Sequence, residues 1–133
     1  MNTKLAMAAA TLIVASIWTS HNVLAQQQGI QRTDLLRHDL SVPGREVIQV
    51  LVEFAPGVSF PRHSHPGEEL VYVTEGSLEY ALEGRPPLTL KAGEVLLIPA
   101  GTPHAVRNVG SNKAAELATY IVEKGKPLVT LVK

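Results

Sequence analysis

The chain has 133 residues, and its 12 basic and 12 acidic side chains leave no net charge at pH 7. The basic residues form no patch or run in the sequence, which argues against a nucleic-acid partner. There is no cysteine, so disulfides are excluded, and one domain of ordinary length must be stabilised by core burial, a bound metal or oligomerisation.

Residues 1–25 have the pattern of a secretory signal peptide. Lys4 is the only charged residue of this segment, and Leu5 to Trp18 forms an apolar run of about 14 residues, shorter than the ~20 that span a bilayer. Val23-Leu24-Ala25 offers small residues for cleavage. We therefore expect cleavage after Ala25, a periplasmic or secreted protein, and no membrane contact after cleavage. An uncleaved membrane anchor is the alternative.

The segment 26–45 is a lead-in that ends in the turn Pro43-Gly44. Residues 33–36 are compatible with a short turn or a first strand. His38 lies far from the other histidines of the mature chain, and we interpret it as a surface or rim residue. A β-rich run, 46–54, then begins a barrel domain that we expect to occupy 46–123.

The stretch from Gly57 to Gly76 concentrates chemically useful side chains. It reads G-x5-H-x-H-x3-E-x6-G, with His63, His65 and Glu69 at the named positions. Residues two apart in a strand point to the same face, so the two histidines project together. Pro66-Gly67 turns the chain, which allows the next strand to return and present Glu69 beside them.

A second stretch, 93–108, reads G-x5-P-x-G-x2-H-x3-N and supplies His104. Its two prolines stiffen the loop before His104 and position this side chain in advance. Imidazole nitrogens suit first-row transition metals, and a carboxylate adds a harder, charged ligand. We predict that His63, His65, Glu69 and His104 bind one divalent metal and leave one or two coordination positions open, as catalysis requires.

The remaining sequence alternates apolar runs with turn signals. These runs predict further strands at 70–74, 77–82, 88–90, 95–98, from 104, and 115–122. Val71 and Val73 share parity with Glu69 and are expected to line the cavity. The C-terminal extension, 124–133, carries another apolar run, which we expect to pair with a strand or with a partner subunit.

The two stretches match both conserved motifs of the cupin superfamily at every defining position, and the chain resembles small, exported, quercetin dioxygenase-like cupins. The resemblance implies an all-β fold, a single-domain jelly-roll-like β-barrel. It also implies a metal site with three histidines and one glutamate, and a homodimer. Cupins include dioxygenases, decarboxylases, isomerases, lyases, ligand-binding regulators and storage proteins, so the fold does not select one function.

Two classes of function follow. The first is a metal-dependent enzyme for a small molecule: a dioxygenase-like oxidoreductase, or less readily a lyase or isomerase. Glu69, if loosely bound, and Tyr80 or Tyr120 are then the candidates for a protein base. The second is a non-catalytic periplasmic protein that binds metal or a small ligand. Ligand type does not separate Fe, Mn, Ni, Cu and Zn.

Overall fold

The computed structural model describes residues 27–133, and this part of the chain folds into ten β-strands without an α-helix. The strands are β1 (Ile30–Asp39), β2 (Arg45–Phe54), β3 (Ser59–Ser64), β4 (Gly67–Glu75), β5 (Ser77–Leu82), β6 (Leu88–Lys91), β7 (Val95–Ile98), β8 (His104–Asn108), β9 (Ala114–Glu123) and β10 (Thr130–Leu131). The prediction of an all-β protein is confirmed. The predicted signal peptide lies outside the described residues.

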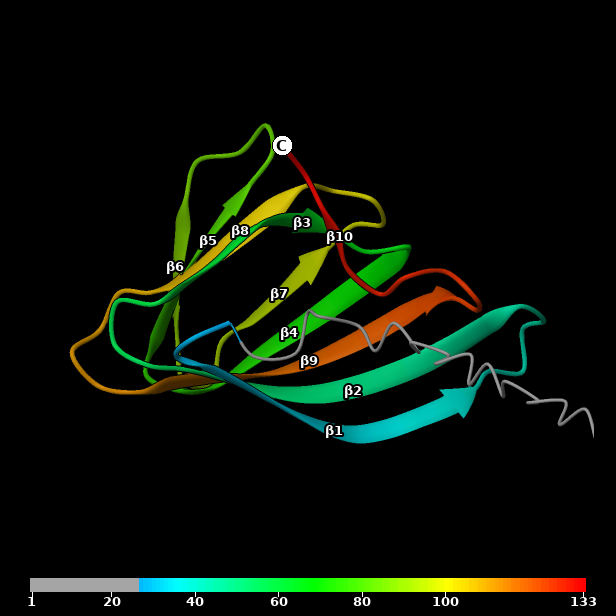
Figure 1. Ribbon diagram of the computed structural model, residues 1–133, viewed down its shortest axis with the longest axis horizontal. Coiled ribbons are helices and arrows are strands. Elements are labelled where there is room, and N and C mark those ends of the chain that lie inside the picture. The colour runs from blue at the N-terminus through cyan, green and yellow to red at the C-terminus, as the bar shows by residue number, and fades with distance from the viewer. Residues whose placement is uncertain (1–26) are drawn as a thin grey trace, which may run out of the picture.

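The strands form two antiparallel sheets that face each other (Figure 1). One sheet has the order β1-β2-β9-β4-β7, and the other has the order β10-β3-β8-β5-β6. Apart from the pairs β1-β2 and β5-β6, neighbours in each sheet are not consecutive in sequence, as in a jelly roll, where the chain passes repeatedly between the two sheets. Within the described residues, no helix combines the length and the hydropathy that a membrane span requires.

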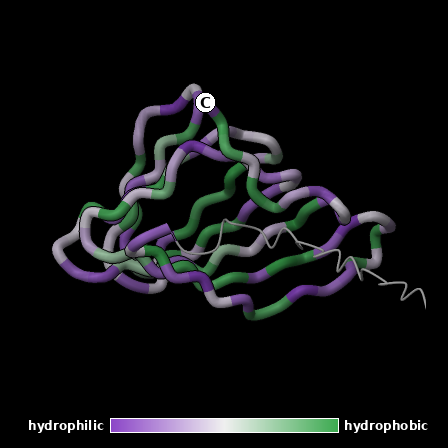
Figure 2. Tube along the Cα trace, in the orientation of Figure 1, coloured by the Kyte–Doolittle hydropathy of each residue, from purple (hydrophilic) through white to green (hydrophobic). Residues whose placement is uncertain are grey.

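The core lies between the two sheets because apolar and polar residues alternate along the strands (Figure 2). In β2 every second residue is buried, and β9 and β4 follow the same rule over most of their length. This period of two places one face of each strand inward. Val71 and Val73 are both fully buried on the inner face of β4, as their parity predicts, but they pack in the core and do not line the cavity of the site, which corrects that part of the prediction.

Both ends of the described chain contribute strands. β1 lies within the segment predicted as a lead-in and pairs with β2 along most of its length. β10 lies in the C-terminal extension and pairs with β3 at Ser64 and His63, while Leu128 and Val129 pack against the core. The extension thus pairs with a strand of its own chain, beside the histidines of the first motif.

Candidate metal centre

The second sheet brings together two histidines that are distant in sequence. His63 is directly opposite His104 in the pairing of β3 with β8. Alternation continues one residue beyond β3, because His63 and His65 are buried while Ser64 between them is only half-buried. The H-x-H spacing therefore directs both rings inward, as the sequence predicted.

Glu69 reaches the histidines from the opposite sheet. It lies on β4, where it pairs with Tyr120 of β9 and Ile98 of β7. At the start of this strand, a Cβ atom on Gly67 would lie 2.0 Å from the carbonyl oxygen of Ile121. Only glycine permits this close approach of β4 to β9. The turn residue of the motif therefore also sets the position of the strand that carries Glu69.

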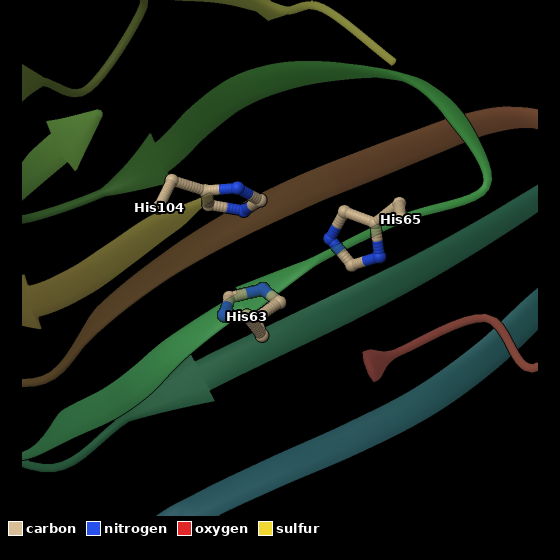
Figure 3. A group of neighbouring side chains, drawn as sticks. All are labelled: His63, His65 and His104. Atoms are coloured by element: carbon tan, nitrogen blue, oxygen red, sulfur yellow. The ribbon is translucent and has the colours of Figure 1, made fainter. Parts of the chain in front are cut away.

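The three imidazole rings point toward a common space (Figure 3). One nitrogen from each of His63, His65 and His104 lies within 4.8 Å of the other two. The carboxylate oxygen Oε2 of Glu69 lies 3.1 Å from Nε2 of His65 and 3.2 Å from Nε2 of His104. The structure thus brings together all four side chains that the sequence predicted as ligands.

Each ring is held by a backbone carbonyl at its other nitrogen. Nδ1–H of His63 donates to the carbonyl of Pro61 at 2.8 Å, and that of His104 donates to Thr102 at 2.9 Å. Nδ1–H of His65 donates to the carbonyl of Leu128 at 2.6 Å. A proton on Nδ1 leaves the lone pair on Nε2 free for a ligand, which is the usual support for a metal-binding histidine.

Two atoms at the centre of the cluster are buried without a hydrogen bond of acceptable geometry among residues 27–133: Nε2 of His65 and Oε2 of Glu69. The two atoms lie 3.1 Å from each other without a hydrogen bond between them. A buried polar atom without a partner is costly. A divalent cation bound by the two atoms would satisfy both, so the residues present fit such an ion.

The protonation states also suit a cation. Burial, and then the neighbouring His104, lower the pKa of His63 to about 3, so its ring is neutral at pH 7. Burial alone raises the pKa of Glu69, but the adjacent rings of His104 and His65 outweigh this effect and lower it to about 2. An ionised Glu69 is a good ligand and a poor proton acceptor, which argues against its predicted alternative role as a base.

The cluster opens into a small internal cavity of about 10 Å³, roughly the space of one water molecule. Four apolar side chains line its walls: Val52, Phe54, Phe60 and Val106. Tyr80 and Tyr120 also line it, and the ring of Tyr120 packs 4.7 Å from that of His65.

Both tyrosine side chains are poor bases in this setting. Burial raises the pKa of Tyr120 well above its usual value, and burial together with the charge of Glu116 raises the pKa of Tyr80. Each hydroxyl therefore keeps its proton at neutral pH, and that of Tyr80 donates a hydrogen bond to Glu116. The predicted candidates for a base do face the site, but their ionised forms are disfavoured there.

Two further residues, His38 of the lead-in and Asn108 of the second motif, do not take part in the cluster. His38 is exposed on β1 and remote from the cluster. The side-chain amide of Asn108 donates to the carbonyls of Phe54, Ala55 and Asn112, and its oxygen accepts from the backbone N–H of Gly110. Asn108 therefore fixes the turn after β8 and has no direct part in the site.

Sequence reasoning missed two charged residues of the cavity, Glu116 and Arg32. Glu116 is buried on the inner face of β9, and Tyr80 donates a hydrogen bond to its carboxyl group. Arg32 is half-buried on β1. The signal for Glu116 was present in the sequence, because it is the one acidic residue in an otherwise apolar run and shares its parity with Tyr120.

The family profile described as "Cupin domain" matches residues 50–132, more than half of the chain. The protein is a cupin. Dimethylsulfoniopropionate lyase DddQ of Ruegeria pomeroyi is 39% identical to this cupin over 57 residues, which are 43% of this chain and 28% of the relative. Polyketide synthase CurC of Streptomyces cyaneus is 45% identical over 60 residues, 44% of this chain and 38% of the relative.

A solved structure of recombinant oxalate oxidase in complex with glycolate is similar to the cupin in fold, with a TM-score of 0.63 and 27% identity. The match covers 77% of this chain and 55% of the oxidase. The chain spans well under half the length of the two curated relatives named above. These similarities establish the family and the fold, and they place chemically different proteins among the relatives.

Proposed function

We propose that this cupin is an enzyme that binds one divalent transition metal at His63, His65, Glu69 and His104 and acts on a small oxygen-containing molecule. The observation that carries the proposal is a point where Nε2 of His65 and Oε2 of Glu69 meet, both buried and without a hydrogen-bond partner among residues 27–133. Backbone carbonyls hold all three rings so that one nitrogen of each faces this point. Such preorganisation is expected of a metal site.

A metal at this position would polarise an oxygen atom of the substrate or, if redox-active, exchange electrons with it. The chain itself supplies three imidazole rings, one carboxylate, two tyrosine hydroxyls and apolar walls around the site. The dioxygenase reaction suggested by the resemblance remains our first candidate, with Fe, Mn, Ni or Cu. A lyase or isomerase is the second, because a further buried carboxyl group, Glu116, lines the cavity and can exchange a proton with a ligand.

Metal content tests the proposal first. We expect about one metal ion per chain in the wild type and in the control His38→Ala, whose side chain is exposed. His104→Ala should lose the metal, because a buried ligand is removed. Absence of metal from the wild-type protein isolated from its own compartment would contradict the proposal.

Turnover then separates the functional classes. Consumption of dioxygen with catechol-like, flavonoid-like or keto-acid substrates would identify the dioxygenase. Product formation without dioxygen, particularly with zinc at the site, would identify a lyase or isomerase. Tight ligand binding without any turnover would contradict the enzyme and support the second function predicted from the sequence, a non-catalytic binding protein.

We also propose that the protein is a homodimer. Leu70 and Tyr72 of β4 pair with Leu97 and Val95 of β7 and form an exposed apolar patch on the outer face of the sheet. β7 is the last strand of this sheet, so the same edge of a second copy can extend it about a two-fold axis.

Sedimentation measurements test this assignment. Leu97→Lys should convert the dimer to a monomer, and a monomeric wild type would contradict the assignment.

Export is the remaining part of the proposal. Sequencing the N-terminus of the protein recovered from the periplasm or the medium should show a chain that begins at Gln26. A cytoplasmic protein that retains Met1 would contradict it.

A further inference from the structure

Glu116 occupies an energetically unfavourable position. It lies on the inner face of β9, opposite Val52 of β2 and Val73 of β4, and only 4% of the residue is exposed. Burying a carboxyl group among apolar side chains is costly, and a hydrophobic residue of similar size would usually be at least as stable. The packing of the sheet gives no reason for an acid here, so its presence indicates a role in the site.

The contacts of Glu116 leave one side of the carboxyl group available. Tyr80, from the opposite sheet, donates a hydrogen bond to its Oε2 atom. Among residues 27–133, Tyr80 is the only side chain that hydrogen-bonds to this carboxyl group. Glu116 and Tyr80 line the same cavity as His63, Glu69 and His104, and the apolar side chains form the walls. The cavity therefore has a second polar end that is distinct from the histidine cluster.

Charge and exposure indicate what this cavity accepts. Arg32 is the one lining residue that is not buried, so it marks the side from which a ligand enters. A divalent metal with Glu69 as its only anionic ligand keeps a positive charge, and Arg32 adds another. Burial raises the pKa of Glu116 and so favours its uncharged form, which does not repel an anion. A small carboxylic acid fits this distribution of charge.

We propose that Glu116, supported by Tyr80, is a specificity-determining residue that hydrogen-bonds a hydroxyl group of a small hydroxy acid whose carboxylate lies at the histidine cluster. The short apolar part of the ligand packs against the apolar walls between the two ends. The cavity has room for about one water molecule. Even a small hydroxy acid is larger than this, so the ligand enters only as Arg32, the one lining residue that is not buried, moves aside. This inference rests on the proposed function, because the carboxylate end requires the metal.

Binding to the metal-loaded protein tests this inference with matched pairs of acids. The probes are 3-hydroxypropionate against propionate and 4-hydroxybutyrate against butyrate, measured by calorimetry. In the wild type, at least one hydroxylated acid should bind about tenfold more tightly than its partner, as expected for one well-placed hydrogen bond in a buried site. Glu116→Leu should abolish this preference in a protein that still binds metal.

Two further variants separate a direct contact from a structural effect. Glu116→Gln keeps the shape and the hydrogen-bonding ability and should retain much of the preference, even if Glu116→Leu folds poorly. Glu68→Leu, on the outward-facing side of β4, should retain it fully. Tyr80→Phe removes the supporting donor and should weaken the preference without abolishing it.

Three outcomes overturn the inference while leaving the metal site intact: no preference in the metal-loaded wild type, binding of none of the four acids, or a full preference in a folded, metal-loaded Glu116→Leu protein. A wild type that takes up no metal would instead contradict the proposed function itself. Metal content is therefore measured in the same samples, so that the two failures are distinguished.

Discussion

The cavity has two polar ends that are built in different ways. At one end, His63, His65 and His104 come from two short sequence stretches, and each ring is held by a backbone carbonyl. At the other end, Glu116 and Tyr80 come from two separate strands and are held mainly by each other. Backbone carbonyls are fixed by the course of the chain, here in β3 at Pro61 and in loops at Thr102 and Leu128, whereas a pair of side chains can change its partner when a ligand arrives. The comparison suggests that the first end holds a resident metal ion and that the second end distinguishes between the small molecules that enter the cavity.

The largest expected effect is on metal affinity, which should fall on substitution at the histidine end of the cavity and stay nearly constant on substitution at the Glu116 end. Glu69→Ala removes an ionised ligand and should lower metal affinity by more than the roughly 10–100-fold that loss of an outer partner costs. Glu116→Ala should change it by no more than about twofold, because Glu116 belongs to the other end of the cavity. Calorimetric titration with Mn²⁺ and Zn²⁺ measures both.

A large loss of metal affinity in a folded Glu116→Ala protein would show that Glu116 contributes to metal binding together with the histidine cluster. Equal affinities of the wild type and Glu69→Ala would show that Glu69 is not a metal ligand. The comparison is matched, since both changes shorten a buried glutamate on an inner sheet face to the same side chain.

A smaller loss of metal affinity is expected when the hydrogen bond that holds the ring of His65 is removed. Its Nδ1–H donates to the carbonyl of Leu128, in the C-terminal segment. A chain that ends at Pro127 lacks this acceptor and should bind metal about 10–100-fold more weakly. A chain that ends at Val129 loses β10 but keeps the carbonyl of Leu128, and it should retain most of the affinity.

Thermal unfolding of both truncated chains without metal is the control, because Leu128 and Val129 also pack against the core. Equal metal affinity in the full chain and the chain that ends at Pro127 would show that the carbonyl has no part in positioning His65. Equal losses in both truncated chains would assign the effect to β10 instead.

The comparison of the two ends also explains what could be predicted from sequence. The H-x-H spacing and the turn before Glu69 operate within a few residues, so the local pattern indicates which side chains converge. The strands follow from apolar runs between turns, whereas the jelly-roll fold was implied by the resemblance to cupins. Parity alone placed Val71 and Val73 on the inner face of their strand, but it could not tell that they pack in the core and not against the cavity.

Contacts between distant segments are harder to predict, because they depend on how the two sheets are paired. The acceptor for His65 is a backbone carbonyl 63 residues away, and a carbonyl has no sequence signature. The meeting of Glu116 with Tyr80 requires knowledge that β9 and β5 face each other. Parity could have placed Glu116 on the inner face of its strand, but it could not have identified its partner.

The smallest expected effect concerns the dependence of stability on pH. Burial, and then the charge of Glu69, raise the pKa of Glu116 from 4.5 to about 8, although the hydrogen bond from Tyr80 and the charge of Arg32 oppose the shift. The neighbouring Tyr120 keeps its proton throughout. Between pH 4.5 and about pH 8, the folded chain therefore holds one proton more at Glu116 than the unfolded chain does. This group therefore makes the protein less stable as pH rises, by up to about 1.4 kcal/mol per pH unit.

The window in which this effect is visible lies between pH 6.5 and 8. Below pH 6.5 the lowered pKa of His63 acts in the opposite direction, because the unfolded chain then binds the extra proton and stability rises with pH. We expect urea unfolding of the metal-free wild type to show a fall in stability from pH 6.5 to 8, of about 2 kcal/mol at most. Glu116→Gln has no titrating proton at this position and should remove the fall, whereas Glu68→Gln should preserve it. The same slope in the wild type and in Glu116→Gln would mean that Glu116 is ionised at neutral pH. The second end of the cavity would then carry a negative charge and favour a cationic group over a hydroxyl.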